Sequence, residues 1–597
     1  MKKPLLEESS HVEVGNDVES AVDQKFVGAD QSMSFPDPTT DDGHFGNAYW
    51  RWTIFYAFLI FCIAISPFIF SVCIPQYAAI VNAVILMIFA AVWISIAFNA
   101  LCNFYRMGHI TLPSLKGLET SQTRTFTHVV IVPCYLDPVE VLFDCLGSLL
   151  IQEDPSSLLV VVAFEATTPD LLIKEQTVQE AFKGRFGHFL VTVHVVDKSK
   201  EIAGGCSNKN FALHEAHRYI KDNHIAKVGH AITITTCDTD SLFHPNYFKV
   251  LEMVYNTKNP SINSPPCNCV WQSPLFYNWD LDQRPFFNRV TCLMRTMMMM
   301  GGLISFNLNP MSIFSYPIEL GLKAGFINPR YGVDDIIAKV RWMCATNEAV
   351  PVELLPVPSI SGPTIGLSFW NEYDEWSRQI RRWIVGSSES FHYFVIHWRG
   401  KPFFAGIWWF FMFFCYYAVL LCCAGINSIL AGIPYPWISY PDITVGNLSV
   451  SLKNIGLIFL IIQYIVFAVA FFIDIQAKRM MTVKEEVGWI RNVVHWLLAP
   501  PTLLWYSCIA FASIISFTWK GKKMARHDMA AKDGLESRAV EKIDLGQTMR
   551  HRSTSTSRDS LGKTKPSVTN KDQKVQGLLC TLPERFYFGE YSVAVKK

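Results

Sequence analysis

The sequence has little net charge and no concentrated basic region. Its 597 residues include 52 Lys and Arg against 51 Asp and Glu, for a formal net charge of +1. Nucleic-acid binding needs a concentrated basic face, and no single basic patch stands out. Nucleic acid is therefore not an expected partner. The sequence also shows no internal repeat and no cleavable signal peptide.

The 16 cysteines do not have the regular spacing of a disulfide framework. Several lie inside apolar runs, Cys62 and Cys422 among them, which predicts reduced and packed thiols. Cys267 and Cys269 could ligate zinc. No second pair follows at ligand spacing, so packing is the favoured interpretation.

Apolar residues are abundant. Half of the chain is hydrophobic (50%), 14% is aromatic and the mean hydropathy is +0.21, values that are unusual for a purely soluble protein. Four stretches are long and apolar enough to cross a hydrocarbon core of about 30 Å. They are Thr53–Ile74, Tyr77–Leu101, Pro402–Ala424 and Ile455–Phe472. Positive residues after the second stretch predict a cytosolic flank there.

A fifth apolar stretch, Val487–Phe517, is interrupted by Pro500 and Pro501. Because each proline removes a backbone donor, two interpretations stay open: an interfacial helix followed by one span, or a re-entrant hairpin. The positive residues after Phe517 favour the hairpin and a cytosolic tail.

The loop between the third and fourth spans contains the sequon Asn447-Leu448-Ser449. The predicted topology places this loop outside the cytosol, the side on which glycosylation occurs. Asn447 is therefore a predicted glycosylation site. Two intramembrane asparagines, Asn82 and Asn99, could line a passage or could form helix-packing bonds.

Between the second and third spans, short β-branched runs alternate with helical segments. The runs HVVIVP, LLVVVAFE, FLVTVHVV and AITITTCD predict the strands of a largely parallel sheet. The sequence thus predicts an α/β domain inserted into an α-helical transmembrane bundle. The predicted boundaries are a disordered cytosolic tail over 1–46, two transmembrane helices over 47–104, the α/β domain over 125–366, amphipathic interface helices over 367–398, C-terminal transmembrane helices over 401–518 and a largely disordered tail over 519–597.

Two carboxylates follow the fourth predicted strand. Asp238 and Asp240 in TTCDTDSLF reach the carboxyl edge of the sheet, where open α/β sheets bind ligands. Hard oxygen donors there suit Mg²⁺ or Mn²⁺ that is held mainly by a substrate diphosphate. A solvated turn is the ordinary explanation for an isolated pair, so the motif needs support from others.

Two later motifs add such support. Asp334 and Asp335 in YGVDDIIAKV begin a helical pattern, where a carboxylate is either a helix cap or a general base for an acceptor hydroxyl. In WSRQIRRW, Gln379, Arg382 and Trp383 fall on neighbouring helical positions, so an amide, a guanidinium and an indole can address one ligand. The alternative for this helix is an amphipathic membrane anchor.

The ordered set of motifs resembles the processive membrane glycosyltransferases of the cellulose, chitin and hyaluronan synthase superfamily (glycosyltransferase family 2). The set comprises P-x-Y at Pro133 and Tyr135, the Lys209-Asn210 segment, D-x-D, the D-D pair and Q-x-x-R-W. The resemblance covers about Val129 to Trp383 and the flanking helices. It implies a GT-A (Rossmann-like) fold for the α/β domain.

The resemblance also implies a role for each matching residue. Asp335 would be the general base with Asp334 in support, and Asp240 would bind the metal together with Asp238. Glu165 stands in the place of a uridine-contacting acid, although the usual D-G-S is absent. The implied nucleotide-sugar contacts are Pro133, Tyr135, Asp137, Glu165, Lys209, Asp238, Gln379, Arg382 and Trp383.

The implied function is an inverting hexosyltransferase that uses a cytosolic nucleotide-sugar, a UDP-sugar above all, to elongate a polysaccharide and move it across the bilayer. Its partners would be the donor, a polysaccharide or glycolipid acceptor and membrane lipids, and an oligomer is compatible with the sequence. The expected location is the plasma membrane or Golgi. One alternative is a single-addition enzyme like ceramide glucosyltransferases. Another is a transporter or scaffold whose α/β domain is not catalytic.

Overall fold

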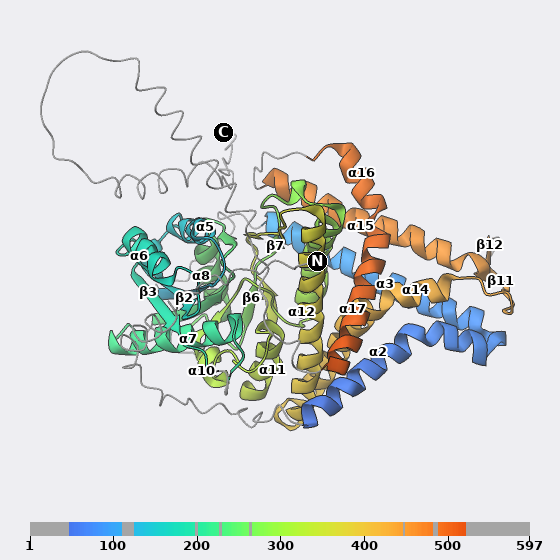
Figure 1. Ribbon diagram of the computed structural model, residues 1–597, viewed down its shortest axis with the longest axis horizontal. Helices are drawn as coiled ribbons and strands as arrows, with labels where there is room; N and C mark the ends of the chain where they lie inside the picture. The colour runs from blue at the N-terminus through green and yellow to red at the C-terminus, as the bar shows by residue number, and fades with distance from the viewer. Residues whose placement is uncertain are drawn as a thin grey trace, which may run out of the picture.

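The computed structural model describes residues 47–109, 124–197, 201–225, 230–261, 266–445, 448–480 and 487–520. The predictions for the tails (1–46 and from 521 onward) and for Asn447 fall outside these ranges. Figure 1 shows an α/β domain at one side and a group of long helices that extends away from it.

The α/β domain is built on a seven-stranded sheet in the order β3-β2-β1-β4-β8-β6-β9. All pairs are parallel except those of β8, which is antiparallel to both of its neighbours. The largely parallel sheet expected from the sequence is confirmed, with β8 as the mixed element. Its strands are β1 (Thr125–Cys134), β2 (Leu158–Glu165), β3 (His188–His194), β4 (His230–Thr236), β6 (Val270–Gln272), β8 (Phe314–Pro317) and β9 (Val352–Leu354).

The central strands are apolar on both faces because both faces are covered by helices. Val130 and Val132 of β1 pack in one hydrophobic cluster with α5 (Val139–Leu150) and α6 (Leu171–Phe182). Val129 and Ile131, which point the other way, pack in a second cluster with three helices, α7 (Gly205–Asp222), α10 (Ile318–Ala324) and α11 (Asp335–Thr346). This two-sided burial explains why the strands appear in the sequence as continuous runs without polar alternation.

The helices between β1 and β9 in the sequence are α5 (Val139–Leu150), α6 (Leu171–Phe182), α7 (Gly205–Asp222), α8 (Tyr247–Lys258), α9 (Phe286–Met298), α10 (Ile318–Ala324) and α11 (Asp335–Thr346). The short strands β5 (Ser241–Phe243), β10 (Ser359–Ser361) and β7 (Leu275–Phe276) form a second sheet in that order. Short single-turn helices join these elements: η2 (Pro155–Ser157), η3 (Leu281–Gln283), η5 (Trp398–Gly400) and η7 (Leu452–Asn454).

Within the described residues, five helices are long and apolar enough to cross a membrane, consistent with an integral membrane protein. The elements that form them are α2 (Asn47–Cys73), α3 (Pro75–His109), the run of α13 (Phe403–Phe413), η6 (Phe414–Cys423) and α14 (Ala424–Gly432), then α15 (Ile455–Met480) and α17 (Ala499–Lys520). The hairpin β11 (Asp442–Val445) and β12 (Leu448–Ser451) joins α14 to α15 at the end far from the α/β domain (Figure 1).

The fifth apolar stretch forms a short helix, α16 (Trp489–Leu497), followed by the 22-residue helix α17. The favoured prediction of a re-entrant hairpin is wrong, because α17 is one continuous helix. The short helix and the single long helix of the alternative are present, and the interfacial location of the short helix stays a prediction. Pro500 and Pro501 lie in the first turn of α17, where backbone N–H groups have no intrahelical partner, so they start the helix and do not break it.

Helix α12 (Phe369–Ile396) lies between the α/β domain and the long helices (Figure 1). Trp505 of α17 donates from Nε1 to the hydroxyl of Tyr373 at 2.7 Å, and Tyr56 of α2 donates to Ser387 Oγ at 3.1 Å. The predicted amphipathic helix is therefore present, but its second half is buried between neighbours.

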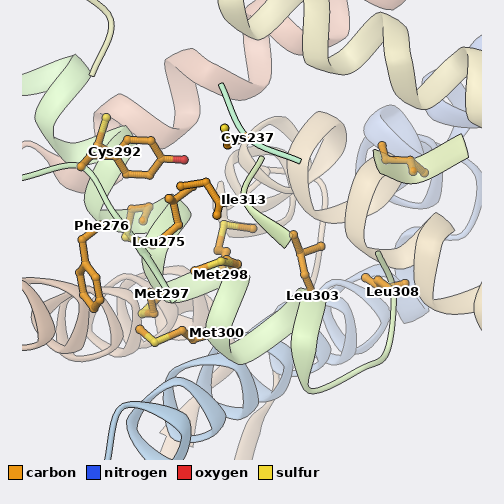
Figure 2. Close-up of a cluster of buried hydrophobic side chains, with 14 of the residues drawn as sticks. Cys237, Leu275, Phe276, Cys292, Met297, Met298, Met300, Leu303, Leu308 and Ile313 are labelled. Atoms are coloured by element: carbon orange, nitrogen blue, oxygen red, sulfur yellow. The ribbon is translucent and has the colours of Figure 1, made fainter. Parts of the chain in front are cut away.

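A methionine-rich core joins the two parts of the molecule. Figure 2 shows Met297, Met298 and Met300 packed near Leu275 and Ile313. These methionines belong to α9 and to the π-helical segment η4 (Met299–Ile304). Flexible methionine side chains fill irregular space where a helix changes its winding.

Candidate active site

One cavity of about 760 Å³ runs from the carboxyl edge of the central sheet to helices η6, α15 and α17. All twelve predicted catalytic, nucleotide-sugar and metal residues line it: Pro133, Tyr135, Asp137, Glu165, Lys209, Asp238, Asp240, Asp334, Asp335, Gln379, Arg382 and Trp383. The fold therefore brings together residues that are dispersed over more than two hundred positions of the sequence. Asn82 and Asn99 are not among the lining residues, and Asn82 instead donates to Ser71 Oγ of α2 at 3.4 Å.

The turn after β4 presents Asp238 and Asp240. Its middle residue, Thr239, donates from Oγ1 to Asp137 Oδ2 at 2.8 Å and also contacts the carbonyl oxygen of Pro133. Asp137 is 2% exposed, so its carboxylate fixes this turn from within the wall of the cavity. The sequence predicted Asp137 as a nucleotide contact, and the structure adds this positioning contact.

Because Gly362 has no side chain, its backbone can lie close to the Asp240 carboxylate. A Cβ atom on Gly362 would lie 2.7 Å from Asp240 Oδ2, and the Gly362 N–H donates to the Asp240 carbonyl oxygen at 3.2 Å. Asp240 itself is 6% exposed. The carboxylate is thus held in a narrow space that a larger residue at position 362 would fill, and no local sequence pattern predicts this contact.

Lys209, in the second turn of α7, bridges two of the predicted acids. Its Nζ lies 2.9 Å from Asp334 Oδ2 and 3.3 Å from Asp238 Oδ1. Burial lowers the pKa of Lys209, but the negative charges of Asp334 and Asp238 outweigh it and leave that pKa well above its usual value. Lys209 is therefore a permanent cation that joins the turn after β4 to the start of α11.

Asp334 and Asp335 differ in their surroundings although they are adjacent. Asp334 caps α11, because its Oδ1 accepts from the N–H of Asp335 at 3.1 Å, and its other oxygen faces Lys209. Asp335 lacks such a direct cationic partner in the described part of the chain. Burial, with the charge of Asp334, raises the pKa of Asp335 to about 7. A carboxylate with a pKa near neutrality is suited to take a proton.

The Q-x-x-R-W residues project into the cavity from α12. Gln379 accepts a hydrogen bond from Thr364. The indole of Trp383 stacks against the guanidinium of Arg295, whose Cζ lies 3.8 Å from the ring centroid. Glu165, the last residue of β2, also lines the cavity, and burial raises its pKa.

Arg295 is a site residue that sequence reasoning missed. It is the single charged residue between Val290 and Ile313, in a run rich in methionine. A lone charge in an apolar stretch is the signal that could have found it, because charged residues are rarely placed in a core without a purpose.

The described residues contain no group of three or more His, Cys, Asp or Glu side chains arranged to hold a metal ion. The donor set that does line the cavity, Asp238 and Asp240, is of the kind that binds Mg²⁺ or Mn²⁺ together with phosphate oxygens. The residues fit a divalent ion that arrives with a substrate diphosphate.

No family model and no curated protein sequence matches this chain. Among solved structures, it is similar to the mannosyltransferase PcManGT from Pyrobaculum calidifontis in complex with GDP-Man and Mn²⁺, at 12% identity over 72% of this chain and 99% of that one, with a TM-score of 0.34. It is also similar to S. aureus TarS 1-349 in complex with UDP-GlcNAc, at 14% identity over 44% of this chain and 66% of that one, with a TM-score of 0.27. Because TM-scores below 0.5 do not establish a shared fold, these likenesses identify no family for this chain.

Proposed function

We propose that this chain is a membrane glycosyltransferase that transfers a sugar from a nucleotide-sugar, a UDP-sugar above all, with inversion at the anomeric carbon. The observation that supports the proposal best is the single cavity that Asp238, Asp240, Asp335 and Trp383 line together with helices of membrane-spanning character. No member of this set is specific alone, but together they supply a base, carboxylates for a metal–diphosphate group and an aromatic platform.

In the proposed reaction, the Asp335 carboxylate takes the proton of an acceptor hydroxyl. The acceptor oxygen forms its bond to the anomeric carbon as the bond from that carbon to the donor diphosphate breaks, and the electron pair leaves with the nucleoside diphosphate. Attack from the face opposite the leaving group inverts the configuration. The raised pKa of Asp335 supports this role, since a base with a pKa near the working pH accepts a proton readily while about half of it is still ionised.

The departing diphosphate is the proposed ligand of the part of the site that Asp238 and Asp240 line. Asp240 and Asp238 would hold a divalent ion there, which neutralises charge on the leaving group when bound. Arg382 would contact phosphate through its planar fork. Lys209, whose contacts are with Asp238 and Asp334, would act on the donor mainly by holding these carboxylates in place. Glu165 and Tyr135 would contact the nucleoside.

The acceptor half of the cavity supports a polymer product. Lining residues continue past Trp383 to Gly432 of α14, Gly456 of α15 and Tyr506 of α17, so the space extends between helices of spanning length. We therefore propose that a cytosolic domain elongates a polysaccharide and passes it toward the bilayer. A single-addition enzyme with a lipid acceptor is the second candidate, because the same apolar walls would accommodate an acyl chain.

A donor screen tests the proposal. Purified full-length protein in lipid nanodiscs, with Mn²⁺ or Mg²⁺, is incubated with UDP- and GDP-sugars, and released nucleoside diphosphate is measured. We expect release from one donor class and a ladder or high polymer on product sizing. A single glycolipid would instead favour the second candidate. No release with any donor, and full biological function of Asp238→Asn and Asp335→Asn variants at normal abundance, would favour a transporter or scaffold.

A further inference from the structure

Arg295 is half-buried, and its partners differ from those of the buried cations in the described residues. Those cations bond to a carboxylate, as Lys209 does to Asp334 at 2.9 Å, or to a backbone carbonyl oxygen, as Lys401 does to that of Phe394 at 2.6 Å. Within the described residues, Arg295 has no carboxylate at ion-pair distance. Its polar contact is with a weak acceptor, since its Nη2 lies 3.7 Å from the Met311 sulfur.

Two aromatic rings flank the Arg295 guanidinium. Its Cζ lies 3.8 Å from the centroid of the Trp383 ring and 4.7 Å from that of Tyr277. Cation–π contacts stabilise the charge through its faces. The five N–H donors of a guanidinium point outward in its plane, so they stay available to oxygen atoms that approach from the edge.

The position of Arg295 assigns it to the acceptor half of the cavity. Arg295 and its neighbour Tyr277 line the same cavity as Asp238 and Asp240. Tyr416 of η6 and Tyr506 of α17 line this cavity too. The cation therefore stands beside Trp383, between the acidic edge of the sheet and the helices of spanning length.

We propose that Arg295, with Trp383 and Tyr277, forms a subsite for an oxyanion on the acceptor or growing product. This inference rests on the proposed function and makes it more specific. An unpaired cation in a partly buried cavity costs free energy that a neutral sugar would not recover, whereas a phosphate or carboxylate forms charge-assisted bidentate hydrogen bonds with it. The ligand chemistry is thus an oxyanion, from either the phosphate of a lipid-linked acceptor or the carboxylate of an acidic sugar.

The test compares three probes with the same short tail: hexyl phosphate, hexyl β-glucuronide and the neutral hexyl β-glucoside. Binding to full-length protein in nanodiscs of neutral lipid is measured by calorimetry, with empty nanodiscs as the blank. We expect one anionic probe to bind wild-type protein at least about tenfold more tightly than the glucoside, because hydrogen bonds to charged groups are the stronger class. Whether the phosphate or the glucuronide shows this preference identifies the source of the oxyanion.

Variants connect the preference to Arg295. We expect Arg295→Gln to abolish the preference for the anionic probe. Arg295→Lys should retain part of this preference, since lysine keeps the positive charge but lacks the planar set of N–H donors of a guanidinium. The control is Arg378→Gln on α12, which removes an exposed arginine paired with Asp374 and Glu375. Equal binding of all three probes to wild-type protein would overturn the subsite, and so would an anion preference that persists in Arg295→Gln.

The binding measurement needs no turnover, so the two proposals can fail separately. Anion binding that depends on Arg295, without nucleoside diphosphate release from any donor, would overturn the proposed function and leave the subsite. Release of nucleoside diphosphate by wild-type protein that shows no anion preference would overturn the subsite and leave the proposed function.

Discussion

At the scale of single residues, the pair Asp334 and Asp335 shows how one contact separates two adjacent carboxylates. Lys209 stabilises the charge of Asp334, whereas burial and the charge of Asp334 oppose that of Asp335. The raised pKa of Asp335 has a direct kinetic consequence. A general base must be ionised, so kcat/KM should fall about tenfold per pH unit below pH 7, and not only below pH 4 as for an ordinary Asp.

The measurement is a pH profile of kcat/KM for wild-type protein and Asp334→Asn. Removing the charge of Asp334 removes a cause of the raised Asp335 pKa, so the acid limb should move to lower pH. An acid limb at the same pH in both proteins would contradict this account of Asp335.

Lys209 offers a second prediction at this scale. Lys209→Met leaves the carboxylates of Asp238 and Asp334 without their shared cation, and breaking a buried pair is costly. Because the side chain of Asp238 is 46% exposed, we expect a loss of only about 2 to 3 kcal/mol in the free energy of unfolding.

Denaturant unfolding in detergent measures this change, with Lys258→Met as the matched control. Lys258 pairs with Glu353 at the surface, where the two side chains are 45% and 32% exposed, so its removal should cost at most about 1 kcal/mol. Equal losses in the two variants would show that Lys209 does not hold the acids together.

The candidate site could be predicted residue by residue because each motif carries its own signature. The strand before D-x-D, the helix start at Asp335 and the Q-x-x-R-W spacing are all local patterns. What the sequence could not provide are contacts between distant segments. That Asp137 holds Thr239, and that Arg295 covers Trp383, depends on tertiary packing that no local pattern records.

At the scale of elements, the π-helical segment η4 joins the α/β domain to the long helices. A Cβ atom on Gly301 of η4 would overlap the carbonyl oxygen of Ile96 in α3. Backbone cannot move aside as a flexible side chain can, so Gly301→Ala should lower the free energy of unfolding by about 1 to 3 kcal/mol or more.

The control for this contact is Gly400→Ala, where an added Cβ would meet only the Cys344 side chain at 3.7 Å, an ordinary van der Waals distance, and it should change stability by at most about 0.5 kcal/mol. Thermal unfolding of both variants in the same detergent compares them. If Gly301→Ala were as stable as the wild type, the close packing of η4 on α3 would be wrong.

Elements were predictable where their periodicity is strong and were not where one signal had two meanings. The strands β1 and β2 could be predicted from their continuous β-branched runs, which occur because both faces of the sheet are covered. Pro500 and Pro501 were ambiguous, because proline both breaks a helix and starts one. The choice depends on what precedes the pair, and here α16 ends at Leu497.

At the scale of the whole molecule, the account requires the cavity to open on the side of the membrane that holds nucleotide-sugars. The connection from α14 to α15 would then lie on the opposite side, and Asn447 within it would be glycosylated. Treatment with an endoglycosidase should shift the mobility of wild-type protein expressed in a eukaryotic cell and leave Asn447→Gln unchanged. If a sequon introduced into the α/β domain were glycosylated instead, the membrane topology would be the opposite of the one proposed.

The most direct test of the central claim is the rate of nucleoside diphosphate release from the preferred donor by wild-type protein, Asp335→Asn and Asp240→Asn in identical nanodiscs. The surface variant Asp374→Asn serves as control, since Asp374 is exposed on α12. The account predicts that the two site variants lose at least about 100-fold in rate while they keep the wild-type unfolding temperature, and that the control keeps full activity. Site variants that are as active as the wild type would contradict it.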